Sequence, residues 1–159
     1  MKKIFLAVIA LITLIACDKK ETVEGANVHI TGNVEGLSQG KLYLQKIEDT
    51  TLVIIDSIQI NGDSKFESHI KLDSPEMLYL ALDRGQTNSI DNSLPFFAEP
   101  GNITIETTLK HFFADAKVKG SKNHDLWIEF KKINDRFNDE NLVLMEKRLQ
   151  NELKPNPTT

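Results

Sequence analysis

The chain has 159 residues, and 19 Lys and Arg against 23 Asp and Glu give it a formal net charge of −4 at pH 7. This acidic balance predicts no nucleic-acid partner, because nucleic-acid binding depends on Lys and Arg against phosphate. The single cysteine excludes an internal disulfide, and a hydrophobic content of 40% is ordinary for one folded domain.

The first 16 residues have the pattern of a bacterial lipoprotein signal peptide. Lys2 and Lys3 precede an apolar run over residues 4–16. The run has the length of a secretory h-region and is shorter than the roughly 20 residues that a helix needs to cross a bilayer. The sequence Leu14-Ile15-Ala16-Cys17 then resembles the lipobox, in which the cysteine sulfur receives a diacylglyceryl group and cleavage follows before the cysteine.

Cys17 is therefore the predicted lipid acceptor. Two or more acyl chains give stable attachment, so we expect a protein that is lipid-anchored to the inner or outer membrane of a bacterial cell envelope. An ordinary signal peptide with an incidental cysteine is the alternative. Residues 17–26 are charged and lack apolar periodicity, which predicts a flexible tether between the lipid and the fold.

Residues 27–120 are predicted to form a β-domain, so the fold class is mainly β. Val28, Ile30 and Val34 alternate with polar residues, which is the period of a half-buried strand. Asn61-Gly62 indicates a hairpin, because both residues accept the positive φ of a tight turn. Residues 78–82 are apolar on both faces and are expected to be a central strand. Short strands joined by turns predict an antiparallel β-sandwich, with a barrel as the alternative.

Residues 121–153 are predicted to be helical, with Asn123 as the N-cap. Two apolar stripes with helical spacing follow each other along this segment and point in roughly opposite directions if the helix is continuous. The first stripe is Leu126, Phe130, Ile133 and Phe137, and the second stripe is Leu142, Met145, Leu149 and Leu153.

We expect the first stripe to pack on the β-domain. The second stripe is then a candidate surface for a partner protein, a second copy or a further segment. A kink near Asn138 that folds the second stripe back onto the β-domain is the alternative. Pro155 and Pro157 end any helix, so residues 154–159 are predicted to form a disordered tail.

Four segments in chain order resemble one protein family. They are "ITGNVEGLSQGKLYL", "DSIQINGDSKFES", "FFAEPGNITI" and "VKGSKNHDLW". These segments are similar to the domain of unknown function 4369, which is typically N-terminal in lipoproteins of the Bacteroidetes group. The resemblance runs from about Val28 to Phe130 and implies a β-rich domain on a lipid tether. In many members this domain precedes a thioredoxin-like domain, but this sequence contains no C-x-x-C, so the redox activity is not carried over.

The sequence contains no H-E-x-x-H, G-x-S-x-G or P-loop motif. We therefore predict a non-catalytic protein without a cofactor. His29 and His69 fall on the polar phase of their strands, where they could face one another and bind a metal. Scattered, solvent-facing histidines are the favoured interpretation, so no metal site is predicted.

Asp56 shares its strand face with Ile54 and Ile58 if alternation is strict. Since an unpaired buried carboxylate is costly, a β-bulge at Asp56-Ser57 or an edge position is expected. Asp56-Ser57-Ile58 and Asp49-Thr50-Thr51 also resemble the O-glycosylation acceptor pattern of the same bacterial group. Ser57 and Thr50 are therefore candidate acceptors.

The segment Asp83 to Ser93 is a polar stretch of loop length, and such loops often carry function. Arg84 is the only arginine before Arg136 and is a candidate contact for a carboxylate or phosphate on a ligand. A solvated loop with an incidental arginine is the alternative.

The sequence thus predicts a membrane-anchored envelope lipoprotein that carries a non-catalytic binding or interaction module. The alternative function is an accessory role in thiol:disulfide chemistry that a separate thioredoxin-like partner performs. An enzyme would require a pocket with converging acidic or histidine side chains, and the sequence identifies none.

Overall fold

The computed structural model describes residues 23–85 and 89–153. Cys17, the predicted signal peptide, most of the tether and the predicted tail lie outside these ranges. The described part contains eight strands and one long helix.

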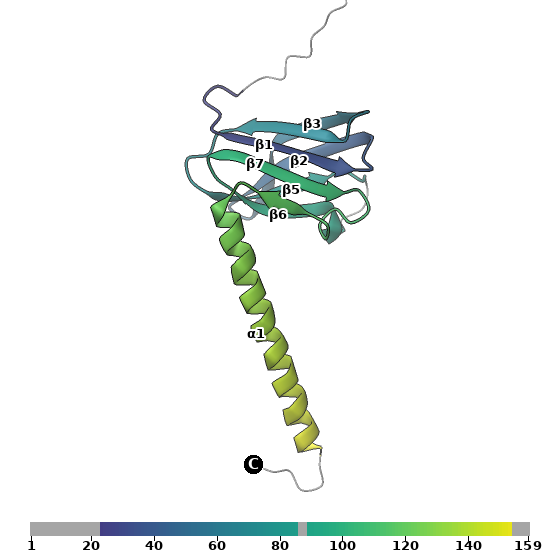
Figure 1. Cartoon of the computed structure of the whole chain (residues 1–159), viewed down its shortest axis with the longest axis vertical. Helices are drawn as coiled ribbons and strands as arrows, with labels where there is room; N and C mark the ends of the chain where they lie inside the picture. The colour runs from purple at the N-terminus through teal and green to yellow at the C-terminus, as the bar shows by residue number, and fades with distance from the viewer. Residues whose placement is uncertain (1–22, 86–88, 154–159) are drawn as a thin grey trace, which may run out of the picture.

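The strands form two four-stranded sheets that pack face to face, with the long helix leaving one end (Figure 1). The first sheet has the order β4 (Lys65–Ile70), β1 (Val28–Glu35), β7 (Gly101–Thr108) and β8 (Lys117–Lys119). The second has the order β3 (Thr51–Asn61), β2 (Gln39–Glu48), β5 (Glu76–Leu82) and β6 (Ser93–Ala98). A short 3-10 helix, η2 (Ile90–Asn92), precedes β6, and the helix α1 spans Lys122–Glu152.

This arrangement confirms the predicted β-sandwich, since the two sheets do not close into a barrel. The predicted central strand, residues 78–82, lies between β2 and β6. Described strand pairs are antiparallel except for β1 and β7, which run parallel with Ile30 opposite Ile103. The strands of this pair lie about 70 residues apart, and local alternation carries no information on pairing over such a separation.

The core lies between the sheets and is built by the inward phase of each strand. Val28, Leu42, Leu80 and Ile103 are among its fully buried members. Phe112 belongs to the loop after β7 rather than to a strand, yet its side chain is also fully buried. The loop is fixed by a hydrogen bond of 2.6 Å from the Thr107 hydroxyl to the Phe112 carbonyl.

Two glycines are required by close contacts in the first sheet. A Cβ atom on Gly32 would lie 2.1 Å from the Ile105 carbonyl oxygen and 2.6 Å from the Phe66 ring. Gly120 has φ +93, and a Cβ atom there would lie 2.0 Å from the Asn102 carbonyl oxygen. Gly120 therefore permits the sharp turn that joins β8 to α1.

Asp56 lies on an edge strand and next to a bulge, so both predicted solutions occur, although the bulge falls earlier than predicted. The register shifts where Leu44 faces Asp56 and the next residue of β2 faces Ile54, which leaves Ile55 as the extra residue. As a result Ile54 is 51% exposed, whereas Ile58 after the bulge is buried.

The helix α1 is a single element of 31 residues, with no kink near Asn138. Its N-cap is Ser121, whose hydroxyl accepts from the His124 N–H at 3.0 Å. The prediction of Asn123 as the cap was wrong by two positions, because Ser121 presents its hydroxyl to the open N–H groups of the first turn. Within the described ranges, no helix is long and apolar enough to cross a membrane.

Candidate functional sites

The helix α1 carries an exposed apolar surface. Figure 1 shows the helix projecting from the sandwich into open space for most of its length. Nine large apolar side chains of the helix and one at its C-cap, Leu153, are exposed. The nine are Leu126, Phe130, Ile133, Phe137, Leu142, Val143, Leu144, Met145 and Leu149. Soluble monomers rarely expose apolar patches larger than a few hundred Å² unless the patch is an interaction site.

The prediction that the first stripe packs on the β-domain was wrong. Its side chains are at least 60% exposed, and the second stripe ranges from 58% for Leu149 to 77% for Leu153. Helical spacing identified the apolar faces correctly but carried no information about what covers them. The kink alternative required the second stripe to fold back onto the sandwich, but these side chains are exposed.

Among the described residues, the side chains that attach α1 to the sandwich lie in the first turns of the helix. Glu99, in the turn between β6 and β7, accepts from the backbone N–H of Lys122 at 2.6 Å and from the side-chain amide of Asn123. These hydrogen bonds lower the pKa of the Glu99 carboxyl group, and the one from the Lys122 N–H has the largest effect. A carboxylate at this end is also favoured by the positive end of the helix dipole.

Trp127 and His124 provide the apolar part of this attachment. The Trp127 ring lies 6.1 Å from the Phe97 ring and 5.5 Å from the His124 ring, measured between centroids. The Lys131 ammonium lies 4.8 Å from the centre of the Trp127 ring, within the range of a cation–π contact. We call these three helix residues, His124, Trp127 and Lys131, the base of α1.

A second group of interacting side chains lies on the outer face of the first sheet. His29 of β1 and His69 of β4 are directly opposite each other in the antiparallel register. Their Nδ1 atoms are 2.6 Å apart, and the Nε2 atom of His69 lies 2.6 Å from the Glu67 carboxylate. The two histidines therefore face one another, as the less favoured interpretation of the sequence anticipated.

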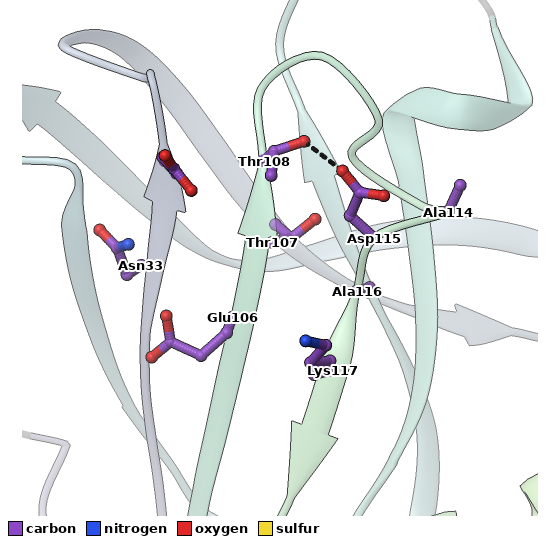
Figure 2. Close-up of a pocket in the computed structure, with 9 residues that line it drawn as sticks. Asn33, Glu106, Thr107, Thr108, Ala114, Asp115, Ala116 and Lys117 are labelled. Carbon is purple, nitrogen blue, oxygen red and sulfur yellow. Dashed lines mark hydrogen bonds between the residues drawn. The ribbon is translucent and has the colours of Figure 1, made fainter.

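A pocket of about 480 Å³ opens at the end of the first sheet (Figure 2). Glu106 of β7 and Lys117 of β8 line it as opposite residues, and the Thr108 hydroxyl donates to Asp115 at 2.8 Å. Glu35 adds a third carboxylate to the lining. Among the described residues, no group of three or more His, Cys, Asp or Glu side chains is placed to hold a metal ion.

The remaining predicted site residues lie apart from one another. Arg84 is exposed, and its guanidinium donates to the Leu109 carbonyl, which ties the loop after β5 to the loop after β7. Thr50 is exposed at the turn between β2 and β3, and Ser57 is exposed on the edge strand β3. The Asp56 carboxylate accepts from the buried Ser68 hydroxyl of β4 at 2.5 Å, so it links the two sheets.

Comparison with known proteins identifies the β-domain. Residues 28–127 match the family model described as "Domain of unknown function (DUF4369)". No curated protein matches the chain. The matched range covers all eight strands and the base of α1 as far as Trp127, well over half of the chain. The chain therefore belongs to the DUF4369 family.

Proposed function

We propose that this protein is a lipid-anchored lipoprotein of the bacterial cell envelope, in which a non-catalytic β-sandwich presents α1 to a partner protein. The lipid anchor is supported by the Leu14 to Cys17 pattern in the sequence. The docking role is supported by the structure, and the observation that carries it is the continuous exposure of apolar side chains along α1.

The energetic argument starts from the cost of leaving these side chains in water. Full burial of a Leu, Ile, Phe or Met side chain is worth about 1.5–3 kcal/mol in transfer terms. Burial of the ten exposed side chains of α1 and its C-cap is a favourable term of the same order as the cost of association, which is about 4–15 kcal/mol. A partner that covers most of these side chains is therefore favoured over one that covers only a few.

The directions of the two stripes restrict the shape of that partner. Successive residues of an α-helix are rotated by about 100°, so the two stripes face well-separated directions. A single straight helix lying along α1 covers one stripe and leaves the other in water. We therefore expect the partner to contact α1 from two sides, through two helices or through a helix and a second apolar surface.

The experiment uses the protein extracted with a mild detergent from its own envelope. Its intact mass should begin at Cys17 and include acyl groups, and a soluble, unmodified protein that retains residues 1–16 would exclude the anchor. Light scattering after size exclusion should give a protein mass above that of one chain beginning at Cys17, because the partner is extracted with it.

Matched variants separate the apolar surface from the rest of the helix. The double variant Leu142→Ser/Leu149→Ser should weaken the complex by about 100-fold or more, since two apolar anchors are lost. The control Lys132→Ser/Gln150→Ser changes exposed polar positions of the same helix and should leave the complex intact. A wild-type protein that elutes as one chain, or equal loss in both variants, would contradict the docking role.

A further inference from the structure

We propose that His29 and His69 form a binding site for a transition-metal ion such as Zn²⁺, Cu²⁺ or Ni²⁺ on the outer face of the first sheet. The site is independent of the docking role of α1. It uses two protein ligands, one from the edge strand β4 and one from its neighbour β1, and water completes the coordination of the metal.

The hydrogen bond from His69 to Glu67 prepares the first ligand. A carboxylate only accepts hydrogen bonds, so the Nε2 atom of His69, 2.6 Å from the Glu67 oxygen, carries the proton. In a neutral imidazole the other ring nitrogen then holds a lone pair, and here this lone pair accepts the hydrogen bond from the Nδ1–H of His29. The Nδ1 atom of His69 is thus presented as a metal ligand, and Glu67 is the carboxylate that usually supports such a ligand from behind.

The position of His29 supplies the second ligand. The Nδ1 atom of His29 lies 2.6 Å from that of His69, with the ring planes at 74° to each other, and its N–H donates to His69. When a metal ion takes the place of this proton, His29 releases the proton to solvent and takes one up at Nε2, so its Nδ1 atom also offers a lone pair. Two nitrogens bound tetrahedrally to Zn²⁺ at about 2.0–2.1 Å are roughly 3.3 Å apart. An opening of roughly 0.7 Å is within reach of a small rotation of the two rings, because the χ2 torsion of histidine is broad.

The surroundings of the pair suit this class of ion. Imidazole favours Zn²⁺, Cu²⁺ and Ni²⁺ over Mg²⁺ and Ca²⁺, which prefer oxygen ligands. The His69 side chain is 26% exposed, so an ion and its waters can approach from solvent. The two strands hold the pair in register through the backbone ladder that places His29 opposite His69, which reduces the ordering cost of chelation.

The test is a calorimetric titration of the full chain with ZnCl₂ at pH 7.5. The chain carries Cys17→Ser, so that its thiol does not compete for the metal. We expect one Zn²⁺ per chain, and a loss of affinity of at least 10-fold in each of His29→Gln and His69→Gln. Glu67→Gln should weaken binding by about 10–100-fold, which is the usual effect of removing a supporting carboxylate.

His111→Gln is the matched control. His111 lies 3.4 Å from Asp115 in the loop before β8, away from the strand pair, so its loss should leave the titration unchanged. The ring ¹⁵N signals of His29 and His69 should also shift with Zn²⁺ in the unsubstituted pair, which decides the question even if a variant fails to fold. Absence of binding, unchanged ring signals, or equal loss in His111→Gln would overturn the proposal.

Discussion

His124 is a buried titratable side chain at the attachment of α1 to the sandwich. The residue is only 6% exposed at the base of the helix, and its Nδ1 atom has no hydrogen-bond partner in the described part of the chain. Burial lowers its pKa from the ordinary value of 6.5, and Lys131 lowers it further, whereas the neighbouring Asp125 acts in the opposite direction. The neutral imidazole is therefore the form that packs against Trp127.

The sign of this shift predicts a loss of stability in acid. Because the folded-state pKa is below the unfolded value, the unfolded chain takes up the proton first. The contribution of His124 is complete above pH 6.5 and is lost as pH falls through the lowered folded-state pKa. We expect the free energy of unfolding in urea to fall more between pH 7.5 and pH 5 for the wild type than for His124→Gln. Equal falls in both proteins would contradict this role.

At the scale of elements, alternation of apolar residues was sufficient to predict the strands but not all their partners. The segment around Val28 was identified because its apolar residues alternate with polar ones, and residues 78–82 were identified because they are apolar on both faces. The parallel pairing of β1 with β7 and the bulge at Ile55 depend on contacts between distant segments. The burial of Phe112 depends on the path of a loop, for which a local pattern gives no signal.

The contact between His29 and His69 could also not be predicted fully from the sequence. The sequence placed His29 and His69 on the outer phase of their strands, which is correct. To predict their contact, one must know the register of β1 against β4. To predict the hydrogen bond between His69 and Glu67, one must also know the rotamer of His69. Neither could be obtained from residue spacing. The two stripes of α1 were likewise visible as a pattern. The exposure of the second stripe was predicted for a continuous helix, whereas the exposure of the first stripe was not.

The helix α1 is expected to contribute little to the stability of the sandwich beyond its base. Described side chains that attach it to the sheets lie no further along than Lys131, whose ammonium is 5.7 Å from the Phe113 ring. Ending the chain at Asn138 removes no buried residue from the described part of α1, so the melting temperature should fall by less than about 3 °C.

Trp127→Ala in the full-length chain is the comparison for that truncation. The substitution removes the ring contacts with Phe97 and His124 and should lower the melting temperature more than the truncation does. A larger loss after truncation would show that the distal half of α1 packs on the sandwich, against the exposed positions of Leu142 and Leu149.

At the scale of the whole molecule, the protein consists of a stable sandwich and a projecting helix with contrasting surfaces. Most apolar side chains of the sheets are buried between them, whereas ten large apolar side chains of α1 and its C-cap are in contact with solvent. A lipid anchor at Cys17 would hold the sandwich close to a membrane and leave α1 free to meet a partner in the same compartment. The central claim is therefore that the apolar surface of α1 is covered in the cell.

Site-specific photo-crosslinking in the intact envelope tests that claim most directly. A photoreactive side chain replaces Leu149 in one strain and Gln150 in another, one residue further and about 100° around the helix. Both positions are exposed in the free protein. The account predicts a discrete, light-dependent protein adduct from position 149 and little or none from position 150. No adduct from position 149, or the same adducts from both positions, would contradict it.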